Sequence, residues 1–264
     1  VGMPEKTASL GCPVGTTEES AQINSTPVCT LSGTYTSDLT LVRGNIYRLG
    51  GKVVIGEDAG QGGRSATLTV QSGVTIIGDD SQDFLVVSRG SDILVNGTKM
   101  APVTMTAELD LTGNVDANSR GLWGGLVING FAPINDCPAN VEGGTAQCTK
   151  EGEAESGLFG GDQPADSSGR LNYLVVKYAG NGVDSQNQLN GIAFQGVGSG
   201  TEVDYIQVHN NFDDGVEFFG GTVDVKHVIL TGNNDDSMDW TDGWVGRAQY
   251  VHIDQQGAGD NGIE

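Results

Sequence analysis

The stretch Asp213-Asp214-Gly215-Val216-Glu217-Phe218 decides the fold, because the chain repeats it twice more. It returns as Asp235-Asp236-Ser237-Met238-Asp239-Trp240 and, shortened, as Asp260-Asn261-Gly262-Ile263-Glu264. The first two copies lie 22 residues apart and the last two lie 25 apart, about the length of one coil of a parallel β-solenoid. The period therefore predicts coils that stack directly on one another.

Apolar residues outside the acidic turn keep the same register. They alternate with polar or ambivalent residues, as in a strand with one buried face. Each coil is therefore expected to contain two short strands, one before and one after the acidic turn. The equivalent positions are Ile206, Val228 and Val251, and Val208, Leu230 and Ile253, with an earlier copy at Ile192, Ala193 and Phe194.

Stacking of the copies also predicts which residues face the interior. Val216 is expected to lie over Met238 and Ile263, and Phe218 over Trp240, as columns inside the coil. The acidic residues that alternate with them are then expected to point outward.

The same register brings carboxylates from different coils together. Asp213 and Asp235 are expected about 4.8 Å apart, the spacing of neighbouring strands. Two unit charges at that distance repel by roughly 3 to 4 kcal/mol at an effective dielectric near 20. A calcium ion, which prefers several oxygen ligands, would convert this repulsion into binding. The predicted ligands are Asp213, Asp214, Glu217, Asp235, Asp236 and Asp239.

A structural interpretation of the same residues stays open. Asp and Asn also cap tight turns through their own backbone, and stacked Asn side chains form ladders inside a solenoid. Under the calcium hypothesis, Asn210 and Asn233 supply carbonyl oxygens near the same corner, and Asp260 and Glu264 extend the array.

Composition narrows the class of partner. The chain of 264 residues has 42 glycines and a formal net charge of −21. Such a surface repels nucleic acids and anionic membranes, whereas calcium and neutral or cationic ligands remain compatible. Acidity that only maintains solubility is the alternative. No apolar stretch approaches the roughly 20 residues that cross a bilayer.

The four cysteines indicate an oxidising compartment. Their spacing lacks the Cys-x-x-Cys pattern of a zinc site and predicts two local disulfides, Cys12 to Cys29 and Cys137 to Cys148. Each would contribute on the order of 3 kcal/mol by the chain-entropy estimate. Disulfides place the protein outside the cytoplasm.

The chain is expected to form a single elongated domain without a flexible linker. Residues 1–32 are predicted to form an N-terminal cap and residues 33–264 the solenoid, with a loop insertion at about residues 131–169. We expect a signal peptide to precede Val1 in the precursor and further coils to follow Glu264. Predicted strands include 39–41, 53–55, 68–70, 74–77, 85–87, 93–95 and 121–128.

Longer motifs resemble a known family. They are the stretch from Gly121 to Asn135 (GLWGGLVINGFAPIN), 197–201 (VGSGT), 206–210 (IQVHN), 213–222 (DDGVEFFGGT) and 230–237 (LTGNNDDS). These are similar to segments of bacterial secreted or outer-membrane-anchored, pectate-lyase-like proteins of poorly defined function. The resemblance implies a single-stranded right-handed parallel β-helix, all-β in class, at an extracellular or outer-membrane surface.

Polysaccharide cleavage is the enzymatic alternative. Acidic pairs can supply an acid and a base, or can hold a calcium ion that polarises a uronate. The Gly-His-Gly and Arg-x-Lys segments of polygalacturonase-like enzymes are absent from the sequence. Candidate lyase bases are Lys177, Lys226 and Arg247, although spacing alone does not direct them to the acidic turns.

The histidines and Trp244 give little indication of a catalytic site. His227 aligns with Tyr205 and Tyr250, whereas His209 and His252 fall elsewhere in the repeat, so a transition-metal site is not expected. Trp244 lies in Gly243-Trp244-Val245-Gly246 and is predicted to be exposed, either as a contact for a sugar ring or as a lid over the coil edge.

Three functions follow from these observations. The first is a non-catalytic extracellular β-helix whose acidic, calcium-stabilised face binds a glycan or another protein. The second is a calcium-dependent polysaccharide lyase or glycoside hydrolase. The third is a structural subunit that stacks end to end, since open strand edges invite pairing.

Overall fold

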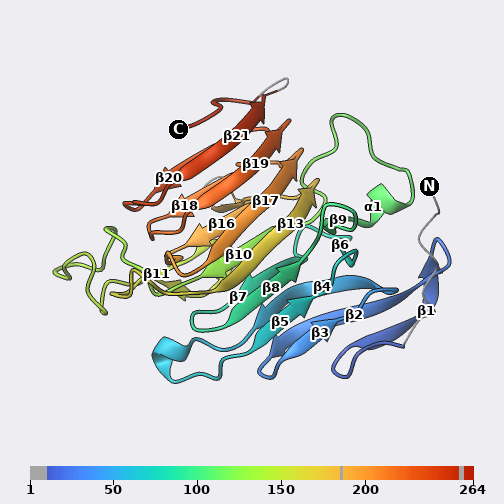
Figure 1. Ribbon diagram of the computed structural model, residues 1–264, viewed down its shortest axis with the longest axis horizontal. Helices are drawn as coiled ribbons and strands as arrows, with labels where there is room; N and C mark the ends of the chain where they lie inside the picture. Colours follow the sequence, from blue (N-terminus) through green and yellow to red (C-terminus); the bar gives the residue numbers. More distant parts are fainter. Residues whose placement is uncertain (1–10, 185–186, 256–258) are drawn as a thin grey trace.

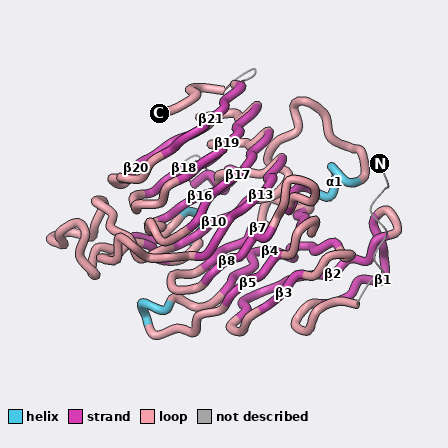
Figure 2. The backbone as a smooth tube through the Cα atoms, viewed as in Figure 1, coloured by secondary structure: helices cyan, strands magenta, loops and turns pink. Residues whose placement is uncertain are grey.

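The computed structural model describes residues 11–184, 187–255 and 259–264, and its fold is the predicted parallel β-helix. Coils stack from the N-terminal end to the C-terminal end of the chain, and neighbouring coils pair strand to strand (Figure 1). Strands make up most of each coil, with loops of varied length between them (Figure 2). A single sheet of 17 strands wraps around the whole stack.

One side of the β-helix, the first face, carries the strands on which the repeat was recognised. Its neighbours pair in parallel and in register, from β7 through β10, β16 and β18 to β20. The C-terminal half of β4 pairs with β7 at the start of this row. The bounds are β4 (Ile46–Ile55), β7 (Phe84–Val87), β10 (Gly125–Asn129), β16 (Ile192–Gln195), β18 (Val216–Phe219) and β20 (Met238–Thr241).

The other two faces share long strands that bend. The first part of β13 pairs with β8 and its last part pairs with β9, with Tyr173 at the bend. Strands β17, β19 and β21 stack on β13 and skip one residue of pairing at the equivalent position. The bounds are β3 (Leu39–Leu41), β5 (Thr67–Val70), β6 (Thr75–Gly78), β8 (Asp92–Asn96), β9 (Val103–Ala107), β13 (Gly169–Lys177), β17 (Glu202–His209), β19 (Val225–Thr231) and β21 (Ala248–Asp254).

The interior columns follow the predicted register. Val216 pairs with Met238, which forms a parallel bridge with Ile263. Val216 and Met238 are at most 1% exposed, whereas Ile263 at the last bridge is 52% exposed. Alternation of apolar residues therefore sets both the register and the core.

Trp240 corrects the predicted interior column. Its backbone pairs with that of Phe218, yet its side chain is 42% exposed. The ring that lies on Phe218 is that of Trp244, at a centroid distance of 4.4 Å. Asp242 and Gly243, both with positive φ, turn the chain back, and the Trp244 indole Nε1 donates to the Val223 carbonyl at 3.1 Å. Trp244 is thus half-buried, and the predicted exposure is wrong.

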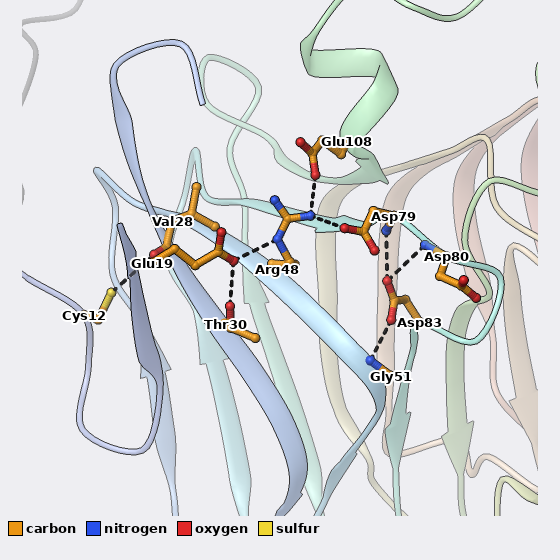
Figure 3. Close-up of polar contacts among 10 residues, drawn as sticks. All are labelled: Cys12, Glu19, Val28, Thr30, Arg48, Gly51, Asp79, Asp80, Asp83 and Glu108. Atoms are coloured by element: carbon orange, nitrogen blue, oxygen red, sulfur yellow. Dashed lines mark hydrogen bonds and ion pairs between the residues drawn. The ribbon is translucent and has the colours of Figure 1, made fainter. Parts of the chain in front are cut away.

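The N-terminal segment is a hairpin fixed to the first coils. Strands β1 (Thr17–Ile23) and β2 (Thr26–Tyr35) are antiparallel, and β2 continues the stack by pairing in parallel with β4. The predicted Cys12–Cys29 disulfide is present. The Arg48 guanidinium bridges Glu19 of β1, Asp79 and Glu108 (Figure 3). Residues 1–10 of the predicted cap lie outside the described residues.

An insertion between β10 and β13 projects from the first face (Figure 1). It contains β11 (Lys150–Glu151), the 3₁₀ turn η2 (Glu153–Glu155), β12 (Leu158–Phe159) and the predicted Cys137–Cys148 disulfide. Phe159, Ile134 and Cys148 of the insertion pack on outward-facing residues of the first face, including Val86 and Val127. A second apolar cluster therefore lies outside the coil.

The remaining elements are short. They are η1 (Ala59–Gln61), α1 (Glu108–Leu111) and the hairpin of β14 (Asn181–Asp184) and β15 (Asn187–Leu189). In the described residues, none of the helices has the length and apolar character needed to span a membrane.

The interior aromatic stack gives a stability prediction. Phe218 is fully buried between Phe194 at 5.1 Å and Trp244 at 4.4 Å. Phe218→Ala should lower the free energy of unfolding by about 3–5 kcal/mol, because it leaves a cavity. Urea denaturation measures this loss. The matched control Trp240→Ala should cost less than half as much, and equal losses would contradict the assignment of the interior ring to Trp244.

Candidate functional site

The outward residues of the first face change from apolar to acidic along the stack. Paired positions run from Val86 through Val127 and Ala193 to Glu217 and Asp239. The insertion covers this column, so that Glu217 points outward as predicted but is only 8% exposed. A carboxylate thus occupies a site that apolar residues fill in the preceding coils.

The acidic turns place the predicted ligands together in three groups. Within each group, carboxylate oxygens of different residues lie within 4.8 Å of one another. The groups share Asp214 and Asp235, so they form one continuous cluster across the coils. They are Asp213, Asp214 and Asp235; Asp214, Glu217 and Asp239; and Asp235, Asp236 and Asp260. We call these residues, with Glu153 described below, the acidic cluster.

Two members of the cluster also cap the next coil. The Asp214 carboxylate accepts the Asp236 backbone N–H at 2.9 Å, and the Asp236 carboxylate accepts the Asn261 N–H at 2.5 Å. Each uses its Oδ1 in this bond, which leaves the second carboxylate oxygen for other contacts. The turn-capping interpretation and the charge-cluster interpretation therefore describe the same side chains.

The asparagines at this corner have structural partners. The Asn233 side-chain oxygen accepts the Asn211 backbone N–H at 3.1 Å, one step of an internal ladder. Asn210 donates its side-chain N–H to the Ala117 carbonyl at 3.1 Å. The expected contribution of Asn233 and Asn210 to a cation site has no support in these contacts.

Two residues complete the buried end of the cluster, and sequence reasoning missed both. Asn190, which is 1% exposed, donates its side-chain N–H to Glu217 Oε2 at 2.6 Å. Glu153 of η2 adds to the negative field at Glu217. The Asn190 Oδ1 and Glu153 Oε2 atoms are buried and have no hydrogen-bond partner among the described residues. The acidic stretch 151–155 was visible in sequence, but its position over β18 was not.

Positive charge does not balance this site. Within the described ranges, none of the ion pairs joins a residue of the acidic cluster to a basic side chain. Lys150 of the insertion pairs with Asp136 at 2.7 Å and Asp242 at 3.1 Å instead. Lys150 offsets part of the charge at Glu153 from a distance, and the remaining negative charge of the cluster is left to protons or a bound cation.

Burial and mutual repulsion raise the pKa values of these carboxyl groups. Burial is the larger cause at each one, and the neighbouring carboxylates add to it. The pKa rises to about 6 at Asp213, about 9 at Asp214, about 10 at Glu217 and about 8 at Glu153. Burial likewise raises the pKa of Asp235 and Asp239.

Two of the three candidate lyase bases lie in other ion pairs, whereas Lys226 is exposed on β19 and has no ion pair among the described residues. Arg247 pairs with Asp224 at 2.5 Å, and Lys177 pairs with Asp110. One face of the Trp244 indole is covered by Phe218. The acidic cluster therefore has the oxygen ligands of a hard cation site, and no basic side chain of the described ranges forms an ion pair with it.

These pKa shifts predict how pH acts on the metal-free protein. A carboxyl whose pKa is raised on folding binds more protons in the folded state, so its contribution to stability is lost as pH rises through the folded pKa. In EDTA, the free energy of unfolding should fall between pH 5 and pH 9, as urea denaturation measures. Glu217→Gln should reduce this slope, whereas the exposed control Asp162→Asn should not. A slope unchanged in Glu217→Gln would contradict the assigned burial.

Comparison with known sequences covers the β-helical part of the chain. Residues 33–264 match the family model of the pectate-lyase-like β-helix domain. Neither the search of curated proteins nor that of solved structures gave a match. The chain with the stacked coils described above belongs to the family of pectate-lyase-like β-helix domains.

Proposed function

We propose that the protein is an extracellular, calcium-binding β-helix that serves as a binding module at a bacterial surface, with a glycan or another protein as its ligand. One observation carries the proposal. Among the residues that the structure describes, carboxylates of successive coils converge without an ion pair to a basic side chain, and two buried oxygens without a hydrogen-bond partner, of Asn190 and Glu153, lie at the same place.

The donor set favours calcium over transition metals. The three groups contain only carboxylate oxygens, and neither His nor Cys belongs to them. Calcium takes six to eight oxygen ligands in flexible geometry, whereas imidazole and thiolate favour zinc and copper. Carboxylates on separate coils can supply such a set with small side-chain adjustments. Extracellular calcium sites bind with dissociation constants of about 0.1–1 mM, and we expect this range here.

The ion would also fix the insertion to the β-helix. Glu153 belongs to the insertion, whereas Glu217 and Asp214 belong to the coil. A calcium ion shared between them would replace repulsion across this junction with attraction. Loops held on a rigid scaffold are where binding sites concentrate. We therefore place ligand recognition on the insertion and the adjoining acidic turns. The two disulfides favour an extracellular location for such a module.

Calcium titration tests the metal site directly. Isothermal titration of EDTA-treated protein should give saturable binding with release of protons, because Ca²⁺ displaces the protons from carboxyl groups whose pKa is raised. Asp214→Asn and Glu217→Gln should each weaken binding at least about tenfold. The control Asp162→Asn, an exposed acid outside the cluster, should bind as the parent does. Equal Ca²⁺ affinity in all four proteins would show that the ion does not bind at this cluster.

Assays of glycan binding and glycan cleavage distinguish a binding module from an enzyme. On a glycan array, a binding module should retain a ligand in Ca²⁺ and lose it in EDTA, with no product released. The same glycans in solution should give no rise in near-ultraviolet absorbance. Unsaturated products that appear only with Ca²⁺ would make the protein a lyase and would overturn the non-catalytic assignment.

A further inference from the structure

A column of aromatic rings runs along the outside of the β-helix, away from the acidic cluster. Tyr173, Tyr205, His227 and Tyr250 occupy the bends of β13, β17, β19 and β21. Their rings stack at centroid distances of 4.4, 4.3 and 4.8 Å, with interplanar angles of 1°, 2° and 15°. Because the ring faces cover one another, the column presents ring edges to solvent.

The backbone at these four positions is unfavourable for the residues that occupy it. Their φ angles are 49°, 55°, 51° and 61°, in the left-handed region. Bulky side chains are rare in this region, where Gly and Asn are usual. Four successive aromatic residues at such bends indicate that the rings themselves are selected, and strain of this kind concentrates at functional sites.

The ring column borders an open groove of about 440 Å³. Val175 and Ile229 contribute apolar side chains to the same groove, and Pro102 lies at the coil before Tyr173. Tyr205, Ile229 and Tyr250 are 39%, 42% and 64% exposed. Grooves of this size with a mainly apolar lining are typical of small-molecule sites.

The groove differs in charge from the rest of this acidic protein. Among the described residues that line it there is no Asp or Glu, although the chain carries a net charge of −21. Lys99, at the bend next to Tyr173 in the stack, is exposed and has no ion pair within the described part of the chain. The Asp204 carboxylate lies beside the column, where its Oδ1 contacts His227 Nδ1 at 2.7 Å and its charge acts on Tyr205 against that of Lys99.

We propose that this groove binds a single amphiphilic anion, with an apolar chain along the ring edges and a carboxylate or phosphate head beside Lys99. The apolar lining accommodates the chain along several rungs, and the exposed ammonium of Lys99 at the end of the column accommodates the head. This site lies outside the acidic cluster and does not rest on the proposed calcium function.

Dodecanoate below its critical micelle concentration is the probe, titrated calorimetrically in EDTA so that calcium plays no part. Saturable binding to one site is expected. Tyr205→Asn should weaken it about tenfold, because Asn removes the ring while it tolerates left-handed φ. Tyr205→Phe should retain binding. Lys99→Glu should weaken the binding of dodecanoate about fivefold and leave the affinity for dodecanol unchanged. The matched charge control Lys52→Glu, on the side of the insertion, should bind as the parent does.

Several results would overturn the proposal. They are absence of saturable binding, equal affinity in Tyr205→Asn and the parent, or a preference for neutral oligosaccharides over dodecanoate. Binding only to vesicles of phosphatidylglycerol, and not to the monomer, would indicate a membrane surface instead and would equally overturn it. Far-ultraviolet circular dichroism establishes that each variant is folded. Calcium binding is measured separately. A failure of dodecanoate binding therefore does not affect the proposed calcium site, and a failure of calcium binding does not affect the proposed groove.

Discussion

The structure depends on one constraint, the parallel in-register stacking of coils. Neighbouring strands lie about 4.8 Å apart, and each paired strand residue lies directly above its equivalent in the previous coil. Like therefore stacks on like. Val216 above Ile192 and below Met238 gains from burial, whereas a carboxylate above a carboxylate is repelled by roughly 3 to 4 kcal/mol at an effective dielectric near 20. A residue that recurs at the same position of successive coils therefore adds its favourable or unfavourable contribution to stability once per coil.

The same constraint explains why so much of the fold was predictable. A shift of one residue would turn every apolar side chain of a strand outward, so the repeat leaves a single register that buries Val216 and Met238. The spacing of the cysteines predicted both disulfides, and the structure confirms them. Placement of Asp213 next to Asp235 also followed from the period, because the turns that carry them are equivalent.

Features that break the repeat could not be predicted in this way. The turn at Asp242 and Gly243 matches that at Gly220 and Gly221 one coil earlier, but no ring follows the earlier turn, so the repeat did not reveal that Trp244, and not Trp240, lies on Phe218. The position of Glu153 depends on the tertiary packing of an insertion that aligns with no coil. The alignment of His227 with Tyr205 and Tyr250 was visible, yet the left-handed bend that turns this alignment into a stack of rings was not.

The two outer columns respond to stacking in opposite ways, and this contrast connects the fold with function. Stacked rings stabilise one another, so the aromatic column at Tyr205 needs no bound ion once its strained bends have formed. The column that reaches Glu217 is apolar in the coils below, where Val127 and Ala193 pack under the insertion. An apolar residue at position 217 would continue this packing without electrostatic cost. A buried carboxylate there, with Asn190 against it and further carboxylates around it, lowers the stability of the isolated chain. Such an arrangement is favourable when a cation balances the negative charge, and this is the physical reason for proposing a calcium site where the apolar column ends.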